Sequence, residues 1–324
     1  MTENGGLEVI GVGAMNLDYI CRVEKTVDDG ETTVTDFIPC PGGSAANTIY
    51  GLARLGIKCG FIGAVGNDTE GRKLLRSFKT AGVDVSRIRV KSGVRTGVAF
   101  CFSDRKGRRA IYLLPGANNL LSNEDVDTAY LNSSRMVHLS SFVNDEQLHM
   151  QIEMVANLAK SVRLSLAPGM LYATRGLKSL APLLERSHIV FLNQEEIKML
   201  TGKDFRAGAE VLLNSSCEIV VVTLGKGIAL RGGRRLNSYI RTRETEYQVS
   251  GVAREMEDIE STGAGDAFAC GFLFGVLKGK PLDECAVLGD VMARSVISTP
   301  GGRKGFLTLK QLEKAYYRYT GKLL

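Results

Sequence analysis

The sequence predicts an α/β fold in which helices cover both faces of a mostly parallel sheet. Short apolar runs alternate with longer amphipathic segments along the chain, and this alternation is typical of βαβ units. The 324 residues, of which 44% are hydrophobic and 23% charged, are enough for one large hydrophobic core. No internal repeat, low-complexity tract or linker interrupts the chain. We therefore expect a single domain over residues 1–324.

The composition argues against several other classes of protein. No apolar run approaches the roughly 18 to 20 residues that a membrane helix needs, and the first residues resemble neither a signal peptide nor a transit peptide. The seven cysteines and three histidines are scattered, so neither a disulfide framework nor a metal cluster is indicated. The net charge of +6 comes without a long basic run that contains aromatic residues. We expect a cytoplasmic protein that binds an anionic small molecule and neither nucleic acid nor a membrane.

The first predicted strand is Leu7–Gly13, a short apolar run that ends in glycine, and Asp18 follows its C-terminal end. The spacing Gly11-x-Gly13-x-x-Asn16 is close to a dinucleotide-binding fingerprint. It lacks the third glycine and no helical pattern follows it, so the sequence argues against a dehydrogenase.

Two predicted β-hairpins project from the main sheet. The first pairs Tyr19–Val23 with Thr32–Ile38, and the second pairs Gly97–Phe102 with Arg109–Leu114. The turn of the second hairpin is rich in basic residues, which are typical of a solvated turn but could also bind a substrate anion. They are Arg105, Lys106, Arg108 and, at the start of the following strand, Arg109.

Between the two hairpins, Gly42 and Gly43 precede a predicted helix that runs to Leu55. Paired glycines permit a sharp or hinged backbone, and Ser44 is a suitable N-cap for this helix. Asn47 then lies in the first turn, where its amide can bind ligand hydroxyl groups or can satisfy local backbone groups.

The remaining elements continue the alternation of strands and helices. The predicted strands are Phe61–Gly66, Met136–Leu139, Arg163–Leu166, His188–Leu192 and Glu218–Leu224, and the predicted helices are Asp68–Ala81, Glu146–Lys160, Leu177–Glu185, Glu195–Leu200 and Val287–Ser298. Asn193 and Glu196 stand three residues apart at a helix start, either as a local cap or as a polar pair in the crevice at the strand ends. A turn, Gly225-Lys226-Gly227, follows the strand Glu218–Leu224.

The stretch from Ile259 to Phe268 carries the strongest chemical signal. Gly263, Ala264 and Gly265 leave little side-chain bulk before a predicted helix Ala267–Lys278, so backbone N–H groups can converge there on an anion. Asp266 would repel an anion unless a cation or a protonatable substrate lies between them. This arrangement suits phosphoryl transfer, in which a carboxylate accepts the proton of an attacking hydroxyl. The alternative is that Asp266 only complements the helix dipole.

Two segments resemble the signatures of one family. Ser261-Thr-Gly-Ala-Gly-Asp-Ala-Phe268 resembles the C-terminal signature of the PfkB/ribokinase carbohydrate kinase family, and Cys40–Gly56 looks like the N-terminal signature. The two signatures are in the right order and more than 200 residues apart. The resemblance extends from Val9 to about Leu312.

This resemblance implies a three-layer α/β/α, Rossmann-like ribokinase fold with a central, mostly parallel sheet and a small β lid built from insertions at about 17–40 and 95–115. It implies transfer of the terminal phosphoryl group of a nucleotide, ATP with ADP as an open alternative, to a primary hydroxyl of a sugar-containing substrate. Three alternatives stay open: a nucleoside kinase, a sugar-phosphate kinase, and a non-catalytic sugar or nucleotide sensor. Family members also suggest a homodimer formed through the lid.

The resemblance also assigns roles to residues. Asp266 is the expected catalytic base, and Gly263, Ala264 and Gly265 form the expected anion hole. Substrate contacts are expected from Asp18, Gly42, Gly43, Asn47 and Tyr112. Nucleotide contacts are expected from Asn193, Thr223, Gly225, Gly227 and Gly301. Glu196 and Asn193 are the expected magnesium residues, acting through water.

The chain departs from the family pattern at several positions. Glu260 replaces the usual first aspartate of the C-terminal signature, which argues against dependence on a monovalent cation such as potassium. Ala167 stands where relatives commonly have aspartate, and Ser44 where ribokinase has lysine, so ribose itself is disfavoured. Because alternation places Tyr112 and Arg109 on opposite faces of a lid strand, we expect either an aromatic or a cationic contact, and favour Tyr112 with a neutral sugar or nucleoside.

Overall fold

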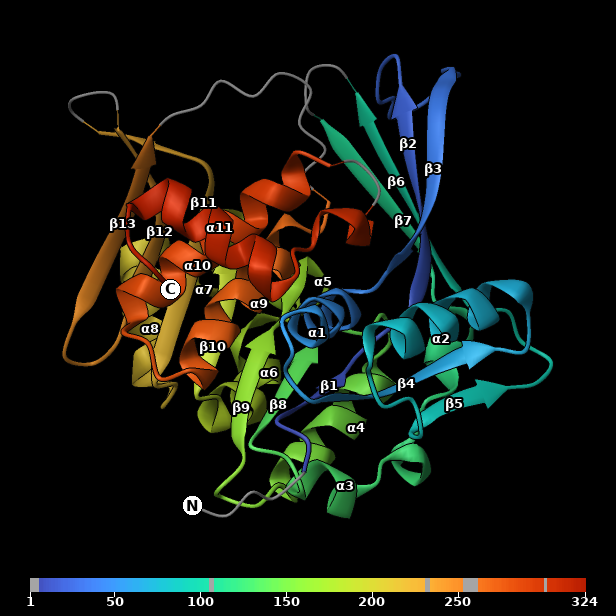
Figure 1. Cartoon of the computed structure of the whole chain (residues 1–324). Helices are drawn as coiled ribbons and strands as arrows, with labels where there is room; N and C mark the ends of the chain where they lie inside the picture. The colour runs from blue at the N-terminus through green and yellow to red at the C-terminus, as the bar shows by residue number, and fades with distance from the viewer. Residues whose placement is uncertain (1–5, 105–107, 231–233, 253–261, 300–301) are drawn as a thin grey trace.

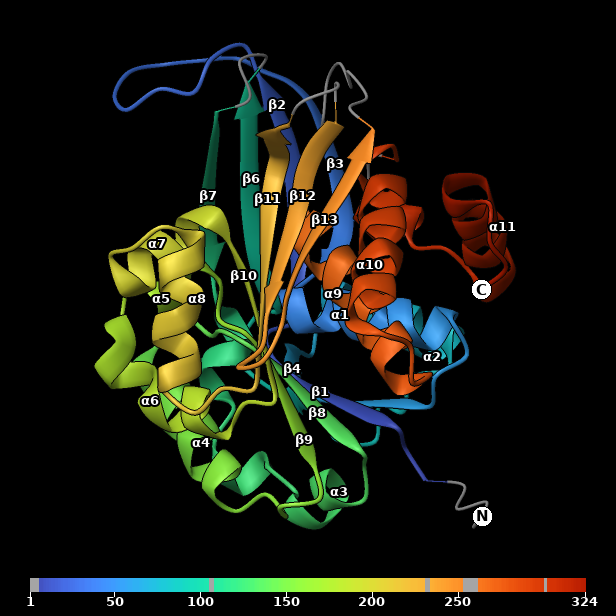
Figure 2. The same ribbon diagram turned by 90° about the vertical axis from the view of Figure 1, so that its left-hand side faces the viewer.

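The structure is a computed structural model that describes residues 6–104, 108–230, 234–252, 262–299 and 302–324. Within these residues, a nine-stranded central sheet lies between two layers of helices, and a separate four-stranded sheet projects from one end (Figures 1 and 2). The α/β/α fold class predicted from the sequence is confirmed. No helix in the described ranges is both long enough and apolar enough to cross a bilayer.

The strands of the central sheet follow the order β13-β12-β11-β10-β9-β8-β1-β4-β5. Their bounds are β1 Val9–Val12, β4 Cys59–Gly66, β5 Ile88–Lys91, β8 Met136–Ser140, β9 Arg163–Ala167, β10 Ile189–Asn193, β11 Ile219–Ala229, β12 Arg234–Arg241 and β13 Glu246–Val252. The strands from β11 to β5 are parallel, whereas β12 and β13 continue the sheet in antiparallel pairing at one edge. Every residue of β1 and β4 is buried, as expected for strands covered on both faces.

Helices cover both faces of this sheet (Figure 2). One layer contains α1 Ser44–Arg54, α2 Thr69–Ala81, α9 Ala264–Leu277, α10 Leu282–Ile297 and α11 Leu309–Thr320. The other contains α3 Thr128–Asn132, α4 Asp145–Ala156, α5 Gly169–Ala173, α6 Gly176–Arg186, α7 Gln194–Thr201 and α8 Phe205–Asn214, and the short 3₁₀ turns are η1 Gly116–Leu120, η2 Asn123–Asp125 and η4 Gly302–Gly305. The middle of α9 is buried all round because α10 packs directly on it: a methyl group on Gly271 would lie 2.4 Å from the carbonyl oxygen of Leu288. This packing fixes α9, and with it the start of the helix, against the sheet.

The projecting sheet, called the lid sheet below, has the order β3-β2-β6-β7. Its strands are β2 Asn16–Val23, β3 Val34–Gly42, β6 Gly97–Asp104 and β7 Arg109–Leu114, so it comes from the two segments expected to form a lid. Both expected hairpins are present, and β2 joins them by parallel pairing with β6 (Figure 1). The face that carries Asp18, Ile20 and Ile111 is called the inner face, and the face that carries Tyr19 and Tyr112 the outer face.

Several expected boundaries were wrong for local reasons. Helix α9 begins at Ala264 instead of Ala267, because Gly263 at φ 81° serves as its N-cap. Gly43, at φ 94°, is the N-cap of α1 in place of Ser44, whose hydroxyl is used elsewhere. Helix α4 ends at Ala156 instead of Lys160. Strand β11 continues through the expected turn at residues 225–227, with a shift in its pairing to β12.

Candidate active site

Asp266 lies in the first turn of α9 but does not cap that helix. Its carboxylate instead points at α1: Ser44 Oγ donates a hydrogen bond to Oδ1 at 2.7 Å, and Asn47 Nδ2 donates one to Oδ2 at 2.9 Å. Thr48 Oγ1 also donates to the backbone carbonyl of Asp266 at 3.2 Å. These contacts join the two segments that carry the family signatures, and they hold Asp266 in one orientation.

The surroundings of Asp266 tune its acidity. Burial raises the pKa of Asp266 to about 6, and the hydrogen bonds from Ser44 and Asn47 and the positive charge of Arg303 act in the opposite direction. A carboxylate whose pKa lies near the working pH is a better proton acceptor than one of ordinary acidity. The electrostatics therefore suit a general base at neutral pH.

The anion-hole residues form the N-terminus of α9. The amides of Ala264, Gly265 and Asp266 precede the first intrahelical donor, since the ladder begins with the bond from Ala267 N to Gly263 O at 2.9 Å. No described side chain caps these amides. A methyl group on Gly265 would meet nothing within 4 Å in the described structure, so the space beside this turn is open. The turn can therefore receive an anionic group.

Asp18 lies on the inner face of the lid sheet and is only 8% exposed. Its Oδ1 atom is buried and has no hydrogen-bond partner among the described residues. Burial and the negative charge of Asp266 together raise the pKa of Asp18 to about 7, although the positive charge of Arg303 acts in the opposite direction. Because a buried oxygen without a donor is costly, Asp18 is suited to accept a hydrogen bond from a ligand hydroxyl.

The two glycines before α1 are required for different reasons. A methyl group on Gly42 would lie 2.0 to 2.2 Å from all three terminal atoms of the Asp18 side chain, so only glycine leaves room for that carboxylate. Gly43 combines φ 94° with a position at which a methyl group would lie 2.1 Å from Ala14 O. Gly42 and Gly43 thus let the backbone before α1 pass close to Asp18 and to Ala14.

Arg303, on η4, was not predicted from the sequence. It is 5% exposed and donates from Nε to Asn47 Oδ1 at 3.1 Å, from Nη1 to Ser77 Oγ at 3.2 Å and from Nη2 to Gly42 O at 3.3 Å. Its guanidinium also lies over the rings of Tyr50 and Phe78, at 5.1 and 4.7 Å from their centroids. Burial lowers the pKa of Arg303 to about 10, with Tyr50, Asp18 and Asp266 among the groups that oppose the shift. Nothing in the sequence distinguishes it from its exposed neighbour Lys304.

Asn193 and Glu196 form the local cap that was one of two interpretations. Asn193 Oδ1 accepts from Glu196 N and Glu196 Oε2 accepts from Asn193 N, both at 2.8 Å. Within the described ranges, the cap leaves Glu196 Oε1 without a hydrogen bond. Burial raises the pKa of Glu196, the bond from Asn193 N lowers it, and the charge of Asp266 raises it. Glu196 is therefore close enough to Asp266 to share its electrostatic environment.

The residues expected to hold magnesium through water are Glu196 and Asn193. The described residues contain no group of three or more histidine, cysteine or acidic side chains that could hold a metal ion. Mg²⁺ usually keeps several water ligands and binds through one or two carboxylates together with substrate phosphates. The one carboxylate oxygen of Glu196 that the cap leaves available fits this mode.

Four of the expected nucleotide residues, Asn193, Thr223, Gly225 and Gly227, lie on the neighbouring strands β10 and β11. Thr223 pairs with Asn193 across β11 and β10, so the two are neighbours near the carboxyl end of the sheet. Gly225 and Gly227 both have positive φ, and the Arg235 guanidinium donates hydrogen bonds to the carbonyls of Lys226 and Gly227. Gly301, like Glu260, lies outside the described residues.

Tyr112 does not lie with the other expected substrate residues. Strand pairing places it beside Phe100 and, one strand further, Tyr19, on the outer face of the lid sheet. Its ring contacts Phe102 edge to face at 5.9 Å. The inner face presents Ile111 instead, because β7 pairs Ile111 with Cys101 and β6 pairs Cys101 with Ile20. The expected alternation along β7 is present, but Tyr112, the expected substrate contact, lies on the face opposite Asp18.

The basic residues of the lid also separate. Arg108 forms an ion pair with Asp104, from Nε to Oδ2 at 2.9 Å, and donates to Thr26 O at 3.3 Å, so it stabilises the hairpin. Arg109 is exposed and shares the inner-face register with Ile111. Arg105 and Lys106 lie outside the described residues.

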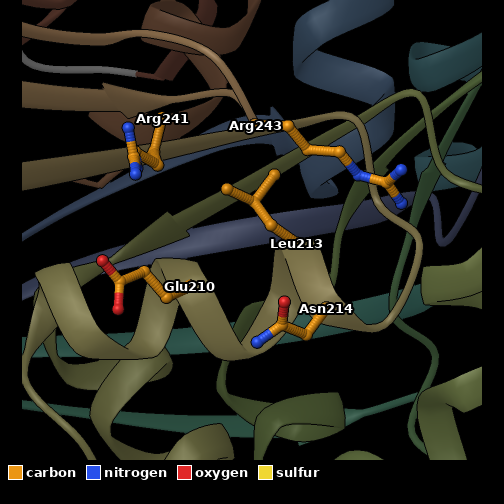
Figure 3. A pocket seen from close by; sticks show the side chains of 5 residues that line it. All are labelled: Glu210, Leu213, Asn214, Arg241 and Arg243. Carbon is orange, nitrogen blue, oxygen red and sulfur yellow. The ribbon is translucent and has the colours of Figure 1, made fainter.

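A surface hollow of about 390 Å³ lies elsewhere, between α8 and the end of β12 (Figure 3). It is lined by Glu210, Leu213, Asn214, Arg241 and Arg243. Arg241 pairs with Val220 at the start of β11, which is the amino end of the parallel strands. Ligands of open α/β sheets bind at the carboxyl ends, so this hollow is separate from the site around Asp266.

The fold and the site define the class of this protein: it is a phosphotransferase that acts on a hydroxyl group. Comparison with known proteins gives the family. Residues 7–308 match the model of the pfkB family carbohydrate kinases, so the chain belongs to this family. The family resemblance read from the two signatures is therefore confirmed, and so is the expected activity as a carbohydrate kinase.

Individual relatives agree with this assignment. The chain is 36% identical over 255 residues to a sugar kinase of Archaeoglobus fulgidus, a match that covers 79% of this chain and 97% of the relative. It is 27% identical to the ribokinase of Haemophilus influenzae, with 93% and 95% covered. Among solved structures, Arabidopsis thaliana ribokinase complexed with ribose and ATP is similar, with a TM-score of 0.78, 22% identity and 96% and 99% of the two chains covered. At that identity the last similarity shows the fold alone.

Proposed function

We propose that this carbohydrate kinase transfers the terminal phosphoryl group of ATP to a primary hydroxyl of a neutral sugar or a nucleoside, with Asp266 as the general base. The observation that carries the proposal is a pair of carboxylates with different tasks, the half-buried Asp266 and the buried Asp18. Asp266 is held by Ser44 and Asn47 beside an open helix N-terminus, whereas Asp18 keeps an oxygen without a partner among the described residues. One carboxylate is fixed for proton transfer, and the other is available to a substrate hydroxyl.

The proposed reaction follows from these positions. Asp18 and the amide of Asn47 orient the substrate so that its reacting hydroxyl lies near Asp266. Asp266 accepts the proton as that hydroxyl oxygen attacks the terminal phosphorus, and the bond from phosphorus to the bridging oxygen of ADP breaks. The amides of Ala264 and Gly265 stabilise the charge on the transferred group. Closure of the lid sheet would exclude water, which would otherwise compete as the phosphoryl acceptor.

We propose Mg²⁺ and ATP as the partners in this reaction. When bound with the nucleotide, Mg²⁺ supplies neutralisation of charge on the phosphate oxygens. Glu196, with Asn193 holding its orientation, would bind the ion through water. The structure of the ribokinase that is complexed with ribose and ATP supports ATP as donor. The expectation of weak or absent potassium dependence, which rests on Glu260, stays a prediction.

The described cations favour a neutral acceptor. Arg303 donates to three partners and lies between two rings, and Arg108 is paired with Asp104, so neither is available to a substrate phosphate. The inner face of the lid sheet carries the apolar side chains Ile20 and Ile111, which suit a sugar ring or a base. A sugar phosphate is the competing acceptor, and Arg109 is the described residue that favours it.

We also propose that the protein forms a homodimer through the outer face of the lid sheet. Phe37, Tyr112 and Leu114 share the outer-face register and are 58%, 60% and 60% exposed. Apolar groups gathered in this way on a protruding sheet are typical of an interface between chains. Sedimentation equilibrium of Phe37→Ser with Tyr112→Ser tests this: the double variant should be monomeric. A cytoplasmic location stays a prediction.

Turnover across a substrate panel tests the proposed function. Purified protein with ATP and Mg²⁺ is assayed for ADP formation with a set of neutral sugars, nucleosides and sugar phosphates. We expect turnover with a neutral sugar or a nucleoside. Turnover confined to sugar phosphates would change the assignment to a sugar-phosphate kinase, and binding without turnover of any acceptor would support a sensor.

A further inference from the structure

The position of Arg303 has a chemical consequence for the base. Three segments that are far apart in sequence meet in one chain of contacts: Arg303 on η4 donates to Asn47 on α1, and Asn47 donates to Asp266 on α9. Arginine can only donate hydrogen bonds, so it fixes the oxygen of the Asn47 amide on its own side. The NH₂ group of Asn47 must then face the carboxylate of Asp266.

Charge adds to this geometric effect. Asp18 is buried and Asp266 is half-buried, the two carboxylates interact with each other, and Arg303 interacts favourably with both. The other groups that face Asp266 are Ser44 and Asn47 from α1 and the acidic Glu196 from α7. Arg303 is the cation among these groups in the described structure, and two neighbouring carboxylates without a cation resist being ionised together because like charges repel.

The surroundings of Arg303 hold it in this role. Ser77 and the carbonyl of Gly42 take two further hydrogen bonds, and the rings of Tyr50 and Phe78 lie over the guanidinium. The guanidinium is too enclosed to be a surface charge. Its partner Gly42 is the same glycine that leaves room for Asp18.

We propose that Arg303 is a positioning residue for catalysis: it orients Asn47 toward Asp266 and supplies the positive charge that lets Asp18 and Asp266 be ionised together. This inference rests on the proposed role of Asp266 as the base. Arg303 touches neither reactant in this scheme, and acts only through Asn47 and the two carboxylates.

Two substitutions separate the geometric effect from the effect of charge. Arg303→Met removes both, and we expect kcat to fall about 10- to 100-fold. The acidic limb of the pH profile of kcat/KM should move upward by about one pH unit or more, because an opposite charge nearby lowers a carboxyl pKa by about 1 to 3. Arg303→Lys keeps the positive charge but loses the planar set of guanidinium donors. We therefore expect a kcat at least fivefold lower and an acidic limb of the pH profile that does not move.

A double substitution tests whether Arg303 acts through Asp266. In the Asp266→Asn background, adding Arg303→Met should change the residual rate by less than threefold, since the base is already gone and Asp18 no longer lies beside a second negative charge. A purely structural role would lower the residual rate by the same factor as in the wild-type background. Arg294→Met is the matched control: Arg294 also pairs with a carboxylate, Asp290, and lies over a ring, Tyr319, and it should leave the pH profile unchanged.

The outcomes distinguish this inference from the proposed function. A wild-type kcat in Asp266→Asn would refute the role of Asp266 as the base, independently of the result for Arg303. A strong loss in Asp266→Asn with an unchanged kcat and pH profile in Arg303→Met would overturn only the role of Arg303. If Arg303→Met does not give a folded protein by thermal unfolding, Arg303→Lys decides the question, and an unchanged kcat in that variant overturns the inference.

Discussion

Gly42→Ala tests by steric displacement how strongly catalysis depends on the position of the Asp18 carboxylate, which is proposed to bind the substrate. The added methyl carbon would lie 2.0 Å from Asp18 Oδ2, 2.1 Å from Cγ and 2.2 Å from Oδ1, whereas such carbons are essentially never found closer than 3.0 Å to a neighbouring atom. Because all three atoms are too close, rotating the carboxylate in place gives no relief, and the whole group must move by about 1 Å or more. A displacement of about 1 Å at a catalytic site can cost about 10²-fold in rate. We therefore expect kcat/KM for the acceptor to fall about 10²-fold, or about 2.7 kcal/mol.

The assay for Gly42→Ala is steady-state kinetics in the acceptor and in ATP, with two controls. Gly6→Ala should have no effect, since its methyl would meet only Ser133 O at an ordinary 3.5 Å. In an Asp18→Ala background the clash disappears, so adding Gly42→Ala should change kcat/KM by less than threefold. A Gly42→Ala enzyme within threefold of the wild type would show that the position of Asp18 is not critical, and an equal loss in both backgrounds would show that Gly42 acts by another route.

Three further predictions concern pH, the lid and potassium. The pKa values of Asp18 and Asp266 are raised to about 7 and about 6, so kcat/KM should rise as the pH rises through 6 to 7. Because the folded state binds these two protons more tightly than the unfolded state does, the free energy of unfolding should fall between about pH 4 and pH 7. A flat rate profile over this range, or stability that rises across it, would contradict these assignments. Single alanine substitutions at Arg105, Lys106, Arg108 and Arg109 should change kcat/KM for a neutral acceptor by no more than about fivefold, because the charges of a solvated turn, as the sequence predicts here, contribute about 0 to 1 kcal/mol. A loss above tenfold that is confined to a sugar phosphate would favour that substrate. Potassium should activate the enzyme weakly or not at all, with activation increased by Glu260→Asp, and a several-fold gain in the unmodified enzyme would refute this.

Local pattern was sufficient for the layers of the fold and for the loop that carries Asp266. Short buried strands such as Cys59–Gly66 have a run of apolar residues that marks a parallel sheet, and glycines such as Gly263 mark the start of a helix. Both features depend on residues that are neighbours in the sequence. The sequence therefore predicted the glycine loop and most of the strands and helices, but it did not predict the strands β5, β12 and β13 or the helices α8 and α11.

Contacts between distant segments were beyond what the sequence could predict. The inner face of the lid sheet is set by the pairing of β2 with β6 and of β6 with β7, so alternation within β7 alone could not show that Tyr112 lies opposite Asp18. Ser44 had the residue type and place of an N-cap, yet its hydroxyl binds Asp266, which is 222 positions away. Arg303 reaches Asn47 across 256 positions. Each of these contacts depends on tertiary packing, and the residues next to Tyr112, Ser44 and Arg303 in the sequence give no signal of it.

The role of Asp266 as the base is tested by two measurements on Asp266→Asn: its kcat and its affinity for nucleotide. The asparagine keeps the size of the side chain and one oxygen for the bond from Ser44 or Asn47, but it cannot accept the substrate proton. We predict a kcat lowered by roughly 10² to 10⁴, the usual contribution of a general base, with the Kd for ATP measured by calorimetry within about twofold of the wild type. A wild-type kcat in this variant would contradict the central claim that Asp266 takes the proton of the attacking hydroxyl.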